Sequence, residues 1–414
     1  NPSQQEQESQ EIRLASNGTN KLDYTVGAFL FDQTINTQGS QVQGSAASRF
    51  LLNPGNVPVG SRGCASPTAN ACNPAVLNGL TSPNTSNIKN TSFAVVGKLN
   101  WEAFNHFHVQ PGIRVNYDKK SGSYVSVVTT GSGSTTLNAD QSATLAPQSY
   151  APRFSAWNVS GDVTLSYDFS ADVHGYATYA KSFKSGGINL SGLPLNAAGT
   201  AVDLTTQTVK PEKVDAFELC LKTQFLDRSV TLNVAGFWTE IGDYQATVNN
   251  GQLTVIRGYL ANAGKVRSRG VEFDASFRPS KRFNLYLNGA YTDTIYQKFT
   301  NAPCPPELSG GTVTTGTPGP AGVPGSLSQV VCDISGQRLP GISKWSFSYG
   351  GEYNVPVGGG DGQVYLGYDG SARSRFSSNP SPSAYTWIAG YSLSNFRLGY
   401  RKKDFNVFAW VHNA

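Results

Sequence analysis

Long alternating segments, joined in pairs by short turns, constrain the fold of this sequence more than any other feature. In one pair, residues 159–167 and 171–181 flank the turn Asp168-Phe169-Ser170, and apolar and polar side chains alternate in both segments. Alternation with a period of two residues is the sequence signature of a β-strand. These segments match or exceed the roughly nine to eleven residues with which a tilted strand crosses a bilayer. The pattern therefore predicts strands that span a membrane.

The same pattern recurs along the chain and predicts about fourteen strands in seven hairpins. The predicted strands are residues 8–16 and 22–33, 92–103 and 107–119, 159–167 and 171–181, 209–225 and 229–248, 259–278 and 283–297, 344–355 and 363–375, and 391–400 and 405–411. Long polar loops between hairpins are predicted near residues 34–90, 121–153, 183–208 and 298–343. Short periplasmic turns and long external loops are typical of an outer-membrane β-barrel. We therefore expect an all-β, antiparallel transmembrane barrel in the bacterial outer membrane.

Composition agrees with this class. Charged residues make up only 14% of the 414 residues, yet no apolar run approaches the ~18 residues of a membrane helix. Nineteen tyrosines and 21 phenylalanines suit strands that are apolar on one face only. A secreted all-β protein is the alternative, but the strands of a sandwich are shorter. The net charge of +5 is scattered without a basic run, which gives no support for nucleic-acid binding.

The two ends of the sequence bear on how the barrel closes. An open sheet edge in lipid leaves backbone groups unpaired at several kcal/mol each, and the chain opens and stops next to predicted strands. Either the fourteen strands close on themselves or further strands lie outside these 414 residues. The chain has no signal peptide and no methionine, so we expect a fragment or a processed form.

Five cysteines are unevenly placed. Cys64 and Cys72 share one long loop, and Cys304 and Cys332 bracket another. In an oxidising compartment each pair is expected to form a local disulfide, with free thiols or metal ligands as the alternative. Cys220 lies within a predicted strand on the polar side, where we expect a buried free thiol.

Several segments resemble recurrent segments of one family, the TonB-dependent outer-membrane receptors. The stronger matches are residues 176–189 (YATYAKSFKSGGIN), 210–219 (KPEKVDAFEL) and 262–273 (NAGKVRSRGVEF). Residues 10–16 and 395–400 are weaker matches. The segments follow the order of the family and span nearly the whole chain, and they are most similar to its iron-complex branch.

The resemblance implies a 22-stranded barrel filled by an N-terminal plug, of which this chain would supply about fourteen strands. It implies active uptake of a ferric siderophore or a similar scarce nutrient. The plug, which would contact the TonB–ExbB–ExbD complex, is expected to lie outside these 414 residues. Outer-membrane lipid and lipopolysaccharide are the expected surroundings. A complete fourteen-stranded porin or channel, or a surface adhesin that uses the long loops, stays open as an alternative.

Residues for ligand contact are expected at the outward strand ends and loops. An anionic ligand such as a ferric chelate favours Arg or Lys beside aromatic rings. Three groups fit this description. They are Tyr179 with Lys181 and Lys184, Arg257 with Tyr259, and Arg373 and Arg375 with Phe376. The alternative for each is a charge on the wall or rim of the barrel that pairs with a neighbour.

Enzymatic chemistry has no support in the sequence. No G-x-S-x-G segment occurs, and the glycine-rich stretches lack a following helix that could cradle a phosphate. His106 and His108 share a face if their strand is regular, so a metal pair is possible, but a pair of rim residues is the simpler interpretation. We expect no catalytic site, no resident metal and no cofactor.

Overall fold

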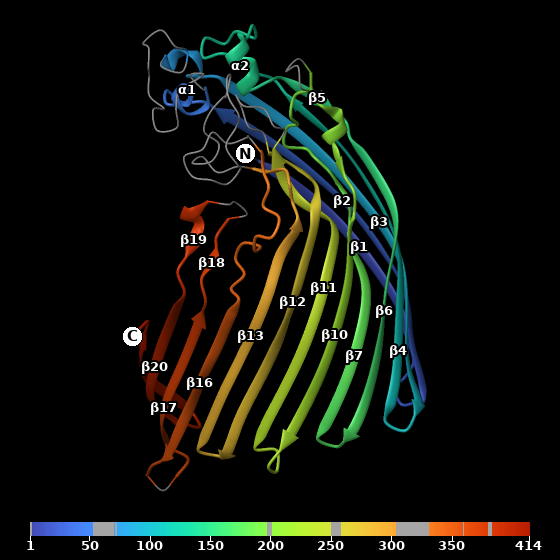
Figure 1. Cartoon of the computed structure of the whole chain (residues 1–414), viewed down its shortest axis with the longest axis vertical. Helices are drawn as coiled ribbons and strands as arrows, with labels where there is room; N and C mark the ends of the chain where they lie inside the picture. Colours follow the sequence, from blue (N-terminus) through green and yellow to red (C-terminus); the bar gives the residue numbers. More distant parts are fainter. Residues whose placement is uncertain are drawn as a thin grey trace.

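Fourteen long strands follow one another along the chain and pair in that order in one antiparallel sheet (Figure 1). The computed structural model describes residues 2–52, 70, 73–196, 201–249, 258–303, 331–358, 360–379 and 383–414. The long strands are β1 Ser3–Ala15, β2 Leu22–Val42, β3 Thr81–Phe104, β4 Phe107–Ser126, β6 Arg153–Ser170, β7 Val173–Lys184, β10 Glu212–Phe225, β11 Val230–Asn249, β12 Gly258–Ser280, β13 Phe283–Lys298, β16 Trp345–Pro356, β17 Gln363–Arg373, β20 Tyr391–Lys402 and β21 Phe405–His412. The predicted meander of hairpins is confirmed.

The remaining elements are short and lie between the hairpins, at the end of the sheet opposite the short turns (Figure 1). They are the helices α1 Ala47–Leu51 and α2 Ala139–Thr144, the 3-10 turns Pro74–Val76, Leu204–Thr206 and Ala384–Thr386, and the strands β5 Gln148–Tyr150, β8 Gly187–Ile188, β9 Thr208–Val209, β14 Ala302–Pro303, β15 Val331–Cys332, β18 Phe376–Ser377 and β19 Trp387–Ile388. In the described ranges, no helix has the length and apolar character needed to cross a membrane.

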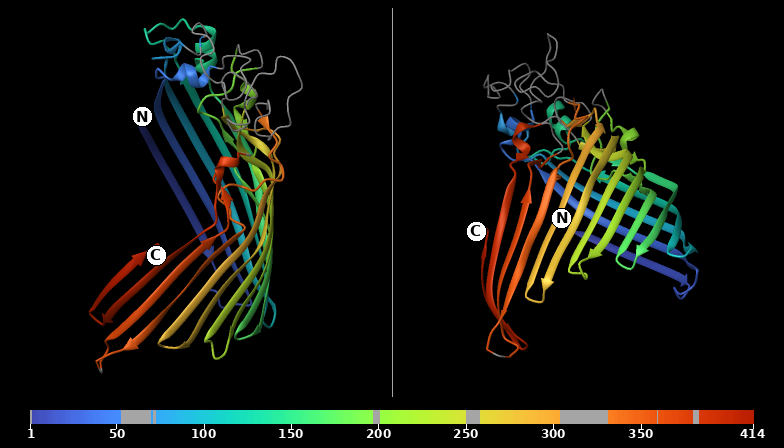
Figure 2. Two further views of the ribbon diagram at one scale, coloured as in Figure 1. Left: turned by 60° about the vertical axis from the view of Figure 1, so that its left-hand side comes forward. Right: turned by 60° about the horizontal axis from the view of Figure 1, so that its bottom comes forward.

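The sheet is strongly curved and open between β1 and β21, the two ends of its strand order (Figure 2). Because successive side chains of a strand point to opposite faces, each strand contributes one set to the convex face and one to the concave face. Residues paired across neighbouring strands share a face, so the pairing carries this division through all fourteen long strands.

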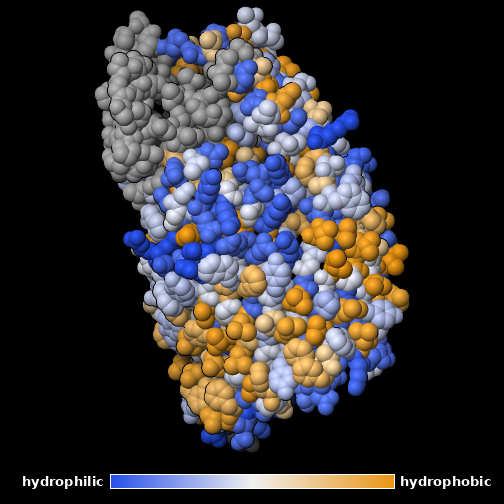
Figure 3. Space-filling view, turned by 45° about the vertical axis from the view of Figure 1, so that its right-hand side comes forward, coloured by the Kyte–Doolittle hydropathy of each residue, from blue (hydrophilic) through white to orange (hydrophobic). Residues whose placement is uncertain are grey.

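The convex face is apolar over much of its height. On β10, Phe217 and Leu221 are paired with Trp238 and Val234 of β11, and Val234 is paired in turn with Phe273 of β12. These side chains remain substantially exposed in the sheet, as Leu219 shows with 68% of its surface accessible. Figure 3 shows hydrophobic side chains gathered over the lower part of this face and a hydrophilic band above them. This is the outer surface expected of a barrel in lipid.

Two strands extend further than predicted. The range near residues 34–90 was expected to be a loop, but β2 runs to Val42 and β3 begins at Thr81, and the two remain paired to their tips. Apart from the paired Ile35 and Ile88, Val42 and Pro83, the side chains of these tips are polar, so no regular apolar alternation marks them in the sequence. The other predicted loops, near 121–153, 183–208 and 298–343, are shorter than predicted because the preceding strands extend a few residues into them.

The turn between β6 and β7 lies later than predicted. Asp168 and Ser170 are paired with His174 and Val173, so the expected turn residues belong to the strand. Residues 171 and 172 make the turn instead. Asp172 accepts a hydrogen bond from Arg228 Nε at 2.8 Å, which links this turn to the one between β10 and β11.

Buried apolar residues gather at the loop end of the sheet in three small clusters. One joins the outward ends of β11, β12 and β13 to the segment that follows β15, around Phe299 and Ile334. A second contains Leu77, Leu80 and Val128. In the third, the rings of Tyr124 and Tyr150 pack 5.3 Å apart beside Leu193. Burial raises the pKa of the Tyr150 phenol. The outward connections are therefore folded onto the strand ends by cores of their own.

Candidate functional site

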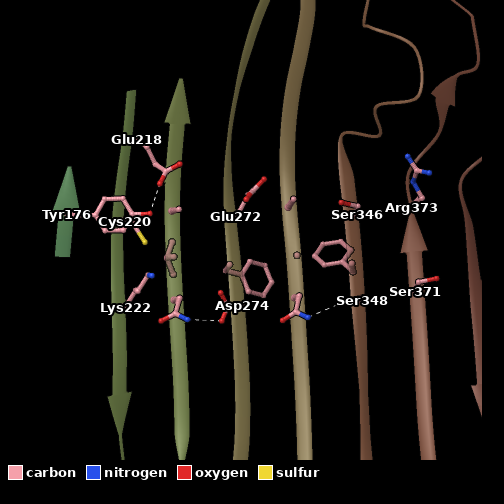
Figure 4. A pocket seen from close by; sticks show the side chains of 18 residues that line it. Tyr176, Glu218, Cys220, Lys222, Glu272, Asp274, Ser346, Ser348, Ser371 and Arg373 are labelled. Carbon is pink, nitrogen blue, oxygen red and sulfur yellow. Dashed lines mark hydrogen bonds between the residues drawn. The ribbon is translucent and has the colours of Figure 1, made fainter. Parts of the chain in front are cut away.

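The concave face carries the polar half of each alternating strand. Its side chains line a pocket of about 610 Å³ (Figure 4). The labelled residues in that view are Tyr176 from β7, Glu218, Cys220 and Lys222 from β10, Glu272 and Asp274 from β12, Ser346 and Ser348 from β16, and Ser371 and Arg373 from β17. In a barrel this face lines a water-filled interior, so the pocket belongs to the lumen wall.

Hydrogen bonds join neighbouring strands across this wall. Tyr176 donates to Glu218 Oε1 at 2.5 Å, and Asn233 Nδ2 donates to Asp274 Oδ2 at 2.8 Å. The Lys222 ammonium lies 5.8 Å from the centre of the Tyr176 ring. Glu218 and Asp274 are therefore each held by a side chain of a neighbouring strand.

A cluster of cations and aromatic rings stands at the outward end of the same wall. The Arg373 guanidinium lies 4.6 Å from the ring centre of Phe376 and donates through Nη2 to the carbonyl of Gly341 at 2.7 Å. Arg375 lies 4.9 Å from the Trp387 ring centre. Strands β18 and β19 hold Phe376 opposite Ile388 and thereby bring the two Arg–ring pairs together. Arg373, Arg375 and Phe376, which the sequence grouped, therefore lie together.

Two aromatic residues of this region were missed by the sequence reasoning. Trp387 stacks on Arg375, and Tyr385 is 87% exposed. They follow a polar stretch and lie outside every predicted hairpin, so only the short β18–β19 pairing reveals that Trp387 lies beside Arg375. Two aromatics within three residues of a polar loop were the available signal.

The structure separates Tyr179, Lys181 and Lys184, which were predicted to act together. Tyr179 and Lys181 lie on the convex face, where both contact Asp215: the Tyr179 hydroxyl donates at 2.8 Å and Lys181 Nζ lies 3.6 Å away. Lys184 has the opposite parity on β7 and pairs with the buried carboxylate of Glu212 at 3.2 Å. A ligand in the lumen therefore cannot contact all three.

For the predicted pair of Arg257 and Tyr259, the structure describes only Tyr259. Tyr259 lies on β12 opposite Val248 of β11 and packs against the Phe299 cluster, where it is half-buried. Arg257 lies outside the described residues. The neighbouring polar contacts hold loop to strand: Asn189 Nδ2 donates to the carbonyl of Leu260 at 2.9 Å.

The cysteine predictions are met only in part by the described residues. Cys332 is buried and disulfide-bonded. Cys64, Cys72 and Cys304 lie outside the described residues, so both pairings stay predictions. Cys220 is a free, buried thiol on the concave wall, as predicted.

The described residues were also examined for clusters of side chains that could bind a metal ion. In those residues, no group of three or more His, Cys, Asp or Glu could hold a metal ion. His106 lies in the turn between β3 and β4 with φ of 68°, and His108 Nδ1 lies 3.2 Å from Asn100 Oδ1. The wall offers charged groups and hydrogen-bond donors and acceptors to a polar ligand.

Comparison with known proteins gives one family and several relatives. The family model for the TonB-dependent receptor-like β-barrel matches residues 3–414. The pesticin receptor of Yersinia pestis is 27% identical over 210 residues, which is 51% of this chain and 26% of the relative. This chain therefore spans a minor part of the length of its curated relatives.

Solved structures show the same fold. The ferric yersiniabactin uptake receptor FyuA of Yersinia pestis superposes with a TM-score of 0.66 at 16% identity, covering 100% of this chain and 49% of that one. The siderophore receptor PiuA of Acinetobacter baumannii gives 0.61 at 18%, covering 99% and 52%. The copper transporter OprC gives 0.58 at 13%, covering 99% and 51%.

Proposed function

The chain belongs to the family of TonB-dependent receptor-like β-barrels, and we propose that it forms the barrel wall of an outer-membrane receptor for the energised uptake of an anionic iron chelate. Proteins of this family are transport receptors. The cargo is proposed from the wall itself, because the names of the relatives include both siderophore receptors and a copper transporter.

The observation that carries the proposal is the cluster of Arg373, Arg375, Phe376 and Trp387 above the polar lumen wall. Guanidinium groups bind carboxylate and catecholate oxygens through paired N–H donors, and aromatic rings stack on the flat ligand groups of a chelate. Tyr385, two residues before Trp387, adds an exposed ring. A bound anion at this height would sit at the mouth of the lumen.

Energy coupling is the second part of the proposal. We infer that further strands and a plug, supplied outside these 414 residues, complete a barrel of about 22 strands, and that the TonB–ExbB–ExbD complex acts on the plug. The chain covers about half the length of the solved receptors that it superposes on, which supports this part. Glu218, Glu272 and Asp274 would then face the plug from the lumen wall.

Ligand binding can be tested with the natural gene product in detergent. A tris-catecholate ferric chelate, which is anionic, and a neutral tris-hydroxamate ferric chelate are titrated while tryptophan fluorescence is followed. The paired substitution Arg373→Gln and Arg375→Gln is expected to weaken binding of the anionic chelate by about tenfold or more, since a hydrogen bond to a charged group contributes about 1.5–3 kcal/mol.

A matched control removes a cation from the opposite end of the same wall. Arg401 also stacks on a ring, with its guanidinium 4.3 Å from the centre of Tyr365. Arg401→Gln is expected to leave chelate affinity unchanged. Equal losses in both variants, or equal binding of the anionic and neutral chelates, would contradict the assignment of the cluster to an anionic ligand.

A further inference from the structure

Strand β21 carries apolar side chains on both of its faces. Val407, Ala409 and Val411 alternate along it with Phe408 and Trp410. On β10 and β12 one face is polar and lines the lumen, whereas β21 presents two rings there, with centres 5.6 Å apart. Phe408 is 45% exposed and Trp410 is 57% exposed. Exposed rings on a wall that meets water favour contact with an aromatic or apolar group.

Pairing places these rings on the same wall as the pocket. Trp410 is paired with Arg397 of β20, and Arg397 is paired with Gly367 of β17. On β17, Gly367 has the same parity as Ser371 and Arg373, which line the pocket. The side chains of Arg397 and Trp410 therefore face the lumen.

Two glycines make this part of the wall flat. A side-chain carbon at Gly399 would lie 2.6 Å from the Tyr365 ring and 2.7 Å from Cβ of Phe408, so glycine allows the two residues to meet there. The Arg397 side chain lies across Gly367, with Nε 3.3 Å from the place of a side-chain carbon. Glycine within a strand often marks the close approach of a ligand or of another backbone. Arg397, Phe408 and Trp410 thus form a flat surface, the lumen platform.

The cation of the lumen platform is partly neutralised. Arg397 Nη2 lies 3.0 Å from Asp369 Oδ2, and the Tyr286 hydroxyl donates to Asp369 Oδ1 at 2.9 Å. At the outward end of the wall, Arg373 and Arg375 stack on rings and form no ion pair among the described residues. Since a paired carboxylate cancels part of the positive charge, an anion is expected to bind less strongly at the platform.

The platform lies below the mouth of the lumen. Arg373 is paired with Tyr391, the first residue of β20. Arg397 follows six residues later on that strand, which is roughly 20 Å at about 3.3 Å per residue. Strands β18 and β19, which hold the outward Arg–ring pairs, lie above β17 and β20 (Figure 1). A ligand that descends along this wall from the mouth therefore reaches the platform.

We propose that the lumen platform is a second, weaker binding site, which takes the planar aryl groups of an anionic chelate after the ligand leaves Arg373 and Arg375. The ligand rings stack on Trp410 and Phe408, and their oxygens accept hydrogen bonds from Arg397. A site along a transport path has to bind its ligand and also release it, which suits a partly neutralised cation. This inference rests on the proposed function and narrows its cargo to chelates that carry aromatic groups.

Calorimetric titration of the natural gene product in detergent tests the platform. The parent variant carries Arg373→Gln and Arg375→Gln, which weaken binding at the mouth, and the probe is a ferric tris-catecholate. Weaker, residual binding is expected in this parent. Adding Trp410→Leu is expected to reduce the residual affinity about three- to tenfold, because leucine is apolar but cannot stack. Adding Trp410→Phe, which keeps a ring, is expected to change it by less than about twofold.

Trp238→Leu in the same parent is the matched control. Trp238 also lies beside an arginine, with the Arg269 guanidinium 5.2 Å from its ring centre, but it is on the convex face. Residual affinity is therefore expected to stay unchanged. Folding of each variant is checked by its heat-dependent shift in gel mobility.

The inference is overturned if the parent binds no catecholate, if Trp410→Leu binds as the parent does, or if Trp410→Phe loses as much affinity as Trp410→Leu. Unchanged binding together with lower thermal stability of Trp410→Leu would assign the platform to packing against another protein segment. The proposed function is judged separately, because it fails if Arg373→Gln with Arg375→Gln leaves catecholate binding intact.

Discussion

The assignment of the two faces predicts opposite outcomes for one substitution at neighbouring positions. Val234 lies on the convex face of β11, between Leu221 of β10 and Phe273 of β12. Asn233 lies next to it on the concave face, where it donates to Asp274. Val234→Arg would place a charge in the middle of the lipid-facing band, and Asn233→Arg would place the same charge in the lumen at the same depth.

The expected magnitudes differ clearly. The apolar stretch of β11 runs from Val230 to Trp238, which is roughly 20 Å along the membrane normal for a strand rise of about 3.3 Å and a tilt of about 40°. Val234 is at its centre, where an arginine costs about 2–4 kcal/mol. That is a roughly 30- to 900-fold fall in the folding equilibrium constant. Asn233→Arg loses one hydrogen bond, about 1 kcal/mol, and gains attraction to Asp274.

Folding of the natural gene product into phospholipid vesicles measures both values. Urea titrations followed by tryptophan fluorescence give the free energy of unfolding, and the heat-dependent gel shift reports the folded fraction. Val234→Ala serves as the control for loss of the valine side chain. The reasoning fails if Asn233→Arg is as destabilising as Val234→Arg, because the pairing would then have assigned the faces incorrectly.

Two further predictions concern the outward end of the sheet. Phe299→Ala removes a ring that is 1% exposed and packs 5.3 Å from Tyr296; we expect local destabilisation of about 3–5 kcal/mol, seen as faster hydrogen exchange in residues 331–339 and little change in β4. Mass spectrometry of the unreduced protein is expected to show Cys64–Cys72 and Cys304–Cys332 linked, and free thiols at all four positions would refute the pairing.

The strands inside the membrane could be predicted because one face of each meets lipid. That contact forces apolar residues at every second position, as in Phe217, Leu219 and Leu221. Above the membrane both faces of the sheet meet water. The tips of β2 and β3 therefore lack the alternation of apolar and polar residues that predicts a strand, although their backbones stay paired to Val42 and Thr81. The length of a strand therefore cannot be predicted from hydrophobic periodicity where its side chains are polar on both faces.

The sequence predicted which candidate-site residues lie together only where those residues are close neighbours along the chain. Arg373, Arg375 and Phe376 are neighbours, and the structure keeps them together. Lys181 and Lys184 are also near neighbours, yet they point to opposite faces because their separation is odd. Contacts that depend on pairing between distant segments, such as that of Arg375 with Trp387, required the structure.

Energy-dependent uptake tests the central proposal most directly. Cells that produce the natural gene product are given the anionic ferric chelate labelled with radioactive iron, in the presence or absence of TonB and of a protonophore. The account predicts that binding at the cell surface persists without TonB or the proton-motive force, while accumulation of iron inside the cell is lost. Undiminished accumulation under both conditions would contradict the account and favour a passive channel.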